Sequence, residues 1–220
     1  WRLGTVVERT ENHEGTLTDE EFNIIVDARG PLQSFLQVGV QRAKILNLDV
    51  LYEDLDSVSF YGELQPSGAV KLEFYSDVGD TVDFANNRPA DGLLLNPVIE
   101  AKLGRHINLE LDHLLQRLDV EGGQLFEANL SQLRLVYNFN VRTFVRGIFQ
   151  WLDLERDPDL YTFFVEPETQ TLFTQLLFSY QVNARTVLFA GYSDNHLGLE
   201  NVDLTQTNRT FFMKIGYAWI

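Results

Sequence analysis

Cysteine is absent from the 220 residues, methionine occurs once, and no apolar run is long enough for a membrane-spanning helix. The missing cysteine excludes a disulfide framework and a thiolate metal site. A spanning helix needs about 18 or more apolar residues in a row, so none is predicted. Basic residues are few, 17 against 32 acidic ones, and the net charge is −15. This balance argues against a nucleic-acid partner, because a phosphate backbone attracts a basic surface.

The clearest pattern lies at the end of the chain, where two kinds of side chain alternate over residues 208–220. The odd positions are apolar or aromatic: Phe211, Met213, Ile215, Tyr217 and Trp219. The positions between them are mostly small or polar. Successive side chains of a strand point to opposite faces, so this segment predicts a strand with one continuously apolar face.

The same two-residue period recurs along the chain, and no segment keeps a 3.6-residue period. Strands are predicted near 1–9, 21–29, 33–44, 57–64, 68–77, 95–104, 106–117, 130–139, 142–152, 171–182, 185–194 and 207–219. Most approach the roughly 9–11 residues with which a tilted strand crosses a bilayer. The mean hydropathy of −0.13 is compatible with such strands, because half of each faces a polar lumen.

The connections between these strands fall into two alternating classes. Short turns are predicted at 30–31, 65–68, 104–105, 140–141 and 183–184, and long loops at 10–20, 45–56, 78–94, 118–129, 153–170 and 195–206. The long set holds most of the acidic residues, and its basic residues are Arg88 and Arg156. Outer-membrane barrels have short periplasmic turns and longer outer loops. We therefore predict a bacterial outer-membrane location, with long loops extracellular and both termini periplasmic.

The predicted fold class is all-β: one transmembrane antiparallel up-and-down β-barrel domain over residues 1–220, with about 12 strands. The first residue is Trp1, without an initiator methionine. We therefore expect a mature form or a fragment, and a barrel that is either complete or the C-terminal part of a larger one. A soluble β-sandwich is a weaker alternative.

The two faces of the predicted strands differ in chemistry. One face is apolar, as in Phe22, Ile24 and Val26 of the second strand, and aromatic residues gather at strand ends. The other face carries charges at bilayer depth, which are tolerable if they face a lumen and pair with one another. This expected charge ladder comprises Lys71, Glu73, Glu100, Lys102, Glu110, Asp112, Arg134, Arg146 and Lys214.

Two stretches resemble known proteins. Lys214, Gly216 and Trp219 are similar to the C-terminal assembly signal of outer-membrane proteins, although the chain ends in Ile220 and not in an aromatic residue. The stretches 133–151 and 176–194 resemble the C-terminal barrel of uncharacterised bacterial proteins that carry an N-terminal domain similar to carbohydrate-binding family 9. This resemblance implies a Gram-negative outer membrane and a further N-terminal part. It supplies no catalytic residues.

The candidate enzymatic residues also have simpler structural explanations. Glu110 and Asp112 share a strand face about 7 Å apart, a spacing open to acid/base work on glycans, but neighbouring Arg134 and Arg146 favour ion pairing. The four histidines form no zinc motif and no lipase-like triad. The acidic residues at 153–159 lack the glycine of an EF-type loop, so loosely bound Ca²⁺ or Mg²⁺ is the most that these loops predict.

The sequence therefore predicts a non-enzymatic barrel that acts as a membrane anchor or scaffold, or as a restricted channel. An outer-membrane enzyme acting on lipid or glycan and an open diffusion pore are the alternatives. The expected partners are outer-membrane lipid and lipopolysaccharide, the barrel-assembly machinery during insertion, and a further N-terminal domain or partner protein. No catalytic residue and no cofactor are predicted.

Overall fold

A computed structural model describes residues 1–218 of the chain. It contains twelve strands: β1 (Arg2–Glu11), β2 (Leu17–Arg29), β3 (Phe35–Asn47), β4 (Val50–Ser67), β5 (Val70–Asp83), β6 (Arg88–Leu103), β7 (Ile107–Val120), β8 (Gly123–Asn140), β9 (Thr143–Arg156), β10 (Glu168–Asn183), β11 (Thr186–Leu199) and β12 (Val202–Tyr217). A short 3₁₀ helix, η1 (Pro158–Leu160), follows β9. The predicted all-β, up-and-down architecture of twelve strands is confirmed. Trp219 of the assembly signal lies outside the described residues.

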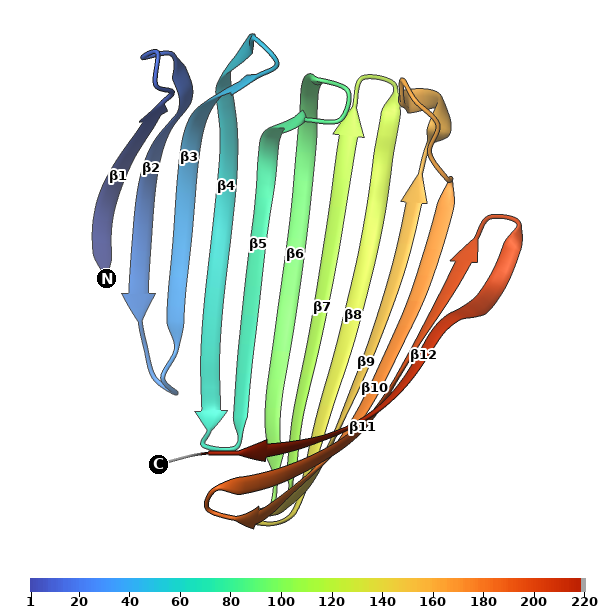
Figure 1. Cartoon of the computed structure of the whole chain (residues 1–220). Helices are drawn as coiled ribbons and strands as arrows, with labels where there is room; N and C mark the ends of the chain where they lie inside the picture. Colours follow the sequence, from blue (N-terminus) through green and yellow to red (C-terminus); the bar gives the residue numbers. More distant parts are fainter. Residues whose placement is uncertain (219–220) are drawn as a thin grey trace.

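The strands form one antiparallel sheet in which each strand pairs with the next along the chain. Figure 1 shows this sheet curling, with the start of β1 and the end of β12 at the end that carries the β2–β3 and β4–β5 turns. We call this the terminal end and the opposite end the acidic end. Within residues 1–218, no helix has the length and apolar character needed to cross a membrane.

The register puts the predicted apolar and polar sets on opposite faces. Val26, Val38 and Phe60 follow one another across β2, β3 and β4, while Asp27 and Gln37 pair on the other face. The apolar side chains remain open to the surroundings: Val38 is 43% exposed and Leu176 of β10 is 46% exposed. We call this apolar side the outer face and the charged side the inner face. A soluble protein rarely leaves such an apolar band uncovered.

The prediction of long loops is mostly wrong, because most of these segments are strand. The strands continue through them, so β3 and β4 are joined by Leu48 and Asp49 alone, and β11 and β12 by Glu200 and Asn201. Leu48 and Asp49 both have positive φ, 45° and 64°, as a type I′ hairpin turn requires. Polar strand extensions satisfy their backbone hydrogen bonds by pairing, and this pairing leaves no apolar signal in the sequence. The segment 157–167 is the one predicted long loop that stays largely without strand structure in the described part.

Buried apolar residues are scarce because the protein is a single curled layer. Ala43, Tyr52, Leu55 and Val82 form a small cluster with Ile45 near the acidic end of β3–β5. The two marginal strands are exposed along nearly their whole length. Among the described residues, β1 pairs only with β2 and β12 only with β11, so the sheet is not closed into a ring.

Candidate functional site

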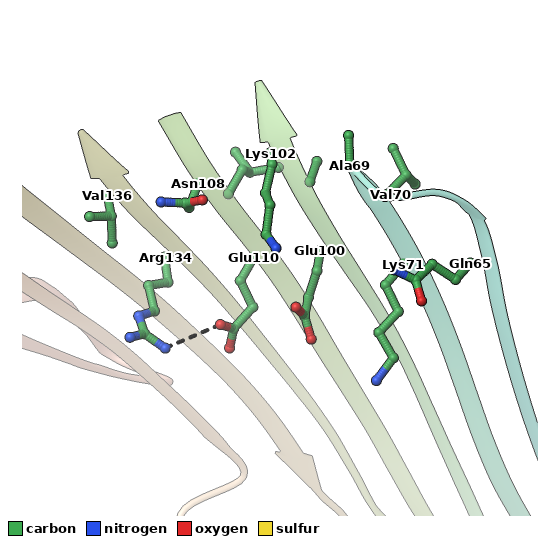
Figure 2. Close-up of a pocket in the computed structure, with 13 residues that line it drawn as sticks. Gln65, Ala69, Val70, Lys71, Glu100, Lys102, Asn108, Glu110, Arg134 and Val136 are labelled. Atoms are coloured by element: carbon green, nitrogen blue, oxygen red, sulfur yellow. Dashed lines mark hydrogen bonds and ion pairs between the residues drawn. The ribbon is translucent and has the colours of Figure 1, made fainter. Parts of the chain in front are cut away.

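The inner face of β4–β8 carries a group of charged side chains near the terminal end. Figure 2 shows Lys71, Glu100, Lys102, Glu110 and Arg134 around a hollow of about 350 Å³. Lys71 lies on β5, Glu100 and Lys102 on β6, Glu110 on β7 and Arg134 on β8. The two-residue period of the strands and their register turn all five side chains to the same side of the sheet. These five members of the predicted ladder therefore lie on one face of the sheet.

The contacts in this group run along β5 and across to the neighbouring strand β4. Glu63 lies directly opposite Glu73 in the β4–β5 register, an arrangement that is repulsive unless it is neutralised. The Lys71 ammonium lies 3.0 Å from Glu73 and 3.7 Å from Glu63. The Tyr61 hydroxyl lies 2.8 Å from Glu73 and 3.1 Å from Glu63. One cation and one hydroxyl therefore hold two facing carboxylates together.

Two further contacts continue the row along the wall. Arg134 donates a hydrogen bond to Glu110 at 3.2 Å. Arg146 donates to the side-chain oxygen of Gln175 at 3.1 Å. These side chains are partly open to solvent, so they line the inner face and do not form a dry core.

Other members of the predicted ladder are not paired. Glu100, Lys102 and Lys214 make no ion pair within residues 1–218, and Asp112 accepts a hydrogen bond from Asn96 at 2.6 Å. Because Glu110 binds Arg134 and Asp112 binds an amide, the two carboxylates considered for glycan chemistry are each held by a structural partner.

Glu63 and Tyr61 were missed by the sequence reasoning. Glu63 and Tyr61 both lie in the predicted strand 57–64 and are two residues apart. The two-residue period of a strand could therefore have placed both side chains on the same face. Their importance comes from the β4–β5 register, which places Glu63 against Glu73. A strand period predicts the face of a residue, but it does not predict which residue of the next strand lies opposite it.

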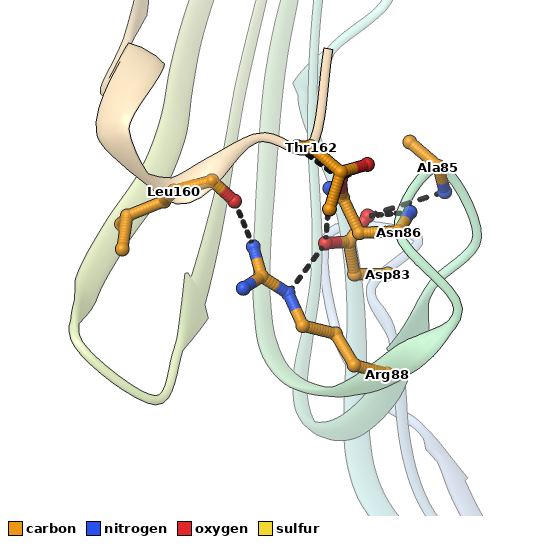
Figure 3. A network of polar contacts seen from close by, with 6 residues as sticks. All are labelled: Asp83, Ala85, Asn86, Arg88, Leu160 and Thr162. Atoms are coloured by element: carbon orange, nitrogen blue, oxygen red, sulfur yellow. Dashed lines mark hydrogen bonds and ion pairs between the residues drawn. The ribbon is translucent and has the colours of Figure 1, made fainter.

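A second polar group lies at the acidic end, where the segment 157–167 meets the β5–β6 turn. Figure 3 shows Arg88 between Asp83 and the backbone carbonyl of Leu160. The Asp83 carboxylate is 2% exposed and lies 2.9 Å from the Arg88 Nε. Asn86 accepts two hydrogen bonds from Thr162, both at 3.0 Å. A connection between β9 and β10 is thus fastened to one between β5 and β6.

The same segment also crosses the turn between β7 and β8. Gly122 has a φ of +110°, and a Cβ at this position would come within 3.0 Å of the Leu160 side chain. The backbone N–H of Asp157 donates to the carbonyl of Leu125, whose side chain is almost fully buried. Burial raises the pKa of Tyr161. Residues 157–167 therefore form a docked strap across the rim, which we call the rim strap.

Charge pairs stabilise the acidic end without forming a metal site. The Arg42 guanidinium makes two hydrogen bonds to Asp56, at 2.7 and 2.6 Å, and these hold the pKa of that carboxyl below its ordinary value. In the part of the chain that the structure describes, no group of three or more His, Asp or Glu side chains is placed to hold a metal ion.

The protein is a curled antiparallel sheet with an exposed apolar outer face. This is the architecture of the wall of an outer-membrane β-barrel. No family model and no curated protein matches the chain. Solved structures do. The outer-membrane expressed OmpT of Vibrio cholerae is similar over 92% of this chain and 66% of its own, with 14% identity and a TM-score of 0.53.

The trimer form of in-vitro folded OmpT from Vibrio cholerae gives nearly the same values: 93% of this chain, 66% of that chain, 12% identity and a TM-score of 0.53. At such identity the likeness concerns the fold alone. The chain spans a little less than two thirds of the length of these OmpT chains. None of these matches concerns a carbohydrate-binding family 9-like domain, so that resemblance stays a prediction.

Proposed function

We propose that this chain forms the wall of a non-enzymatic outer-membrane β-barrel that acts as a restricted channel, with the rim strap narrowing its mouth. The uncovered apolar outer face supports the location, since lipid is the environment in which such a band is stable. The OmpT-like fold agrees with it. Outer-membrane lipid and lipopolysaccharide are then the surroundings of the outer face, and the barrel-assembly machinery inserts the chain.

The observation that carries the channel proposal is the sideways pairing on the inner face. An anchor with a filled interior would need charges that cross the lumen and bury one another. Here Lys71 pairs with Glu73 on its own strand β5 and with Glu63 on adjacent β4, and Arg134 of β8 pairs with Glu110 of adjacent β7; all five side chains keep 23–44% of their surface exposed. Such a wall can be lined by water. It supports a channel more than a solid anchor.

The rim strap supports restriction of this channel. It is held at both sides of the β7–β8 turn, by Arg88 and Asn86 on one side and by its own connections to β9 and β10 on the other. In outer-membrane barrels the elaborate connections lie on the extracellular side and the short turns in the periplasm. We therefore place the acidic end outside the cell and both termini in the periplasm.

Planar-bilayer recording of the protein purified from outer membranes tests this function. We expect discrete openings of small conductance. Arg88→Ala should release the rim strap and raise the conductance or the open time. Arg9→Ala is the matched control, because Arg9 pairs with Glu11 and Glu20 at the same end without contacting the strap. Complete absence of current from all variants would overturn the channel, and a large current insensitive to Arg88→Ala would overturn the restriction.

A further inference from the structure

The second half of the rim strap presents an apolar surface to the surroundings. Phe163 is 51% and Phe164 is 85% exposed. Together with Val165 they line a hollow of about 540 Å³, and Glu200 and Asn201 of the β11–β12 turn line it too. We call it the strap hollow, and it lies between two connections at the acidic end (Figure 1). Its volume is within the range of about 300–1,000 Å³ that is usual for binding pockets.

The strap holds these aromatic side chains in place. Its first half is fastened to the β5–β6 connection through Leu160 and Thr162. Between these two residues, Tyr161 packs edge-on against Phe163, with 5.6 Å between the ring centres. A surface that is already fixed loses little conformational freedom when a partner covers it. Large aromatic side chains on such a surface are favourable anchors for binding.

The charge around the strap hollow has one sign and is not neutralised. The rim strap contains the acidic residues Asp157, Asp159 and Glu166 and no basic residue, and Glu200 adds a fourth carboxylate from the β11–β12 turn. None of these four side chains makes an ion pair in the part of the chain that the structure describes. The apolar surface is therefore bordered by free negative charge.

The β1–β4 side of the acidic end is arranged differently. Its carboxylates are paired with cations of the chain itself: Glu20 with Arg9, Asp56 with Arg42, and Glu53 with Lys44. The acidic residues of the strap thus differ from other acidic residues at the same end of the sheet. Because like charges repel, a cation supplied from outside stabilises the strap corner, where the chain supplies none.

We propose that the strap hollow binds a cationic, partly apolar segment of a partner polypeptide. A large apolar side chain of that segment packs against Phe163 and Phe164. Lysine or arginine side chains beside it pair with Glu166 and Glu200, and cations are also attracted to the faces of aromatic rings. This binding does not depend on whether the lumen conducts, so it goes beyond the proposed function.

Two other occupants fit this surface less well. A second copy in the same membrane presents the same acidic end, so its carboxylates meet carboxylates and repel them. A lipid headgroup that bears phosphate is an anion and is repelled for the same reason. A cationic segment is the occupant that matches both the aromatic side chains and the charge around them.

Peptide binding to the protein in phosphatidylcholine vesicles tests the proposal. The probe is a labelled pentapeptide with one tryptophan between two lysines, and empty vesicles supply the background. We expect saturable binding that weakens as salt is added, because salt screens exposed charges. The same peptide with glutamate in place of lysine should not bind.

Two pairs of variants locate the site. Phe164→Ser should weaken binding about tenfold or more, since burying a phenylalanine side chain stabilises a complex by about that factor. Leu48→Ser is its matched control, because Leu48 is 75% exposed in the β3–β4 turn of the same end. It should leave binding unchanged.

The charge is tested in the same way. Glu166→Gln combined with Glu200→Gln should weaken binding and flatten its dependence on salt. Glu14→Gln combined with Asp49→Asn changes the net charge equally at other turns of the acidic end, and it should have little effect.

Four results would overturn the proposal. The first is no saturable binding by the unaltered protein. The second is binding that needs the peptide lysines but persists in Phe164→Ser, which would show only a general attraction of cations. The third is a dimer in sedimentation that Phe164→Ser dissociates, which would make a second copy the occupant. The fourth is a label at Phe164→Cys that water-soluble quenchers do not reach, which would make lipid the occupant.

Discussion

Exchanging Arg134 and Leu135 tests the two faces of the sheet without changing composition. Arg134 lies on the inner face, where it pairs with Glu110, and Leu135 lies on the outer face opposite Leu109 and Gly147. The double variant Arg134→Leu, Leu135→Arg moves one guanidinium by a single residue and turns it from the inner face toward lipid. Any large effect must therefore come from the face that the charge occupies.

The size of the effect follows from the depth of the position. Leu135 lies five residues before the end of β8 at Asn140. With a rise of about 3.4 Å per residue and a tilt near 45°, this is roughly 12 Å above the turn. An apolar band about 25 Å tall puts that depth near its middle, where an outward arginine costs about 2–4 kcal/mol. Loss of the half-exposed Arg134–Glu110 pair adds no more than about 1 kcal/mol.

A cost of this size lowers the equilibrium ratio of folded to unfolded protein about 30- to 1,000-fold. The assay is the fraction of protein recovered in the outer membrane and its urea midpoint in lipid vesicles. Gln132→Arg is the control, because Gln132 lies on the inner face opposite Asp112 and should tolerate the charge. Equal recovery of the exchanged variant and the control would refute the assignment of faces.

Other predictions concern topology, the inner face, and acid. A cysteine at Asn201 should react with an impermeant thiol reagent on intact cells, whereas one at Ala184 should react only after permeabilisation; the reverse pattern would invert the orientation. Lys71→Gln should leave Glu63 and Glu73 facing each other and lower the unfolding free energy by about 1 kcal/mol, while Lys102→Gln, which breaks no ion pair, should be near neutral. Because Arg42 lowers the folded-state pKa of Asp56, the contribution of this pair is present above the unfolded pKa of about 4 and is lost as pH falls through the folded pKa. The acid sensitivity of urea unfolding should shrink in Asp56→Asn, and an unchanged acid profile would contradict that role.

Strand number, strand order and the chemistry of both faces could be predicted from the sequence because each depends on a local two-residue period. Val26, Val38 and Leu176 are apolar at the right parity, and the structure turns them outward. Strand ends could not be predicted, since Glu20 and Glu53 lie inside strands β2 and β4, although acidic residues of this kind are typical of solvated loops. The contacts that hold Leu160 against the rim could not be predicted from the sequence either. It depends on Arg88 and Gly122, which are remote in sequence.

For the charged residues of the inner face, too, one property could be predicted from the sequence and another could not. The face of Lys71, Glu73, Glu110 and Arg134 follows from parity, but their actual partners follow from register, and register is set by the turns and bulges between strands. Asp112 illustrates the point, because its partner is Asn96 and not a cation. Closure of the sheet is a property of the whole wall. The two-residue period within a strand predicts its faces, but it does not predict whether β1 and β12 pair with each other, and among the described residues they do not.

Nitroxide scanning along β10 in lipid vesicles tests the central claim, a membrane wall with a hydrated inner face, most directly. Residues 174, 176 and 178 should be accessible to oxygen dissolved in lipid. Residues 173, 175 and 177, on the inner face, should be accessible to a water-soluble nickel reagent, while buried Ser179 should be protected from both. Absence of this alternation would contradict the membrane wall, and inner positions closed to both reagents would contradict the hydrated lumen.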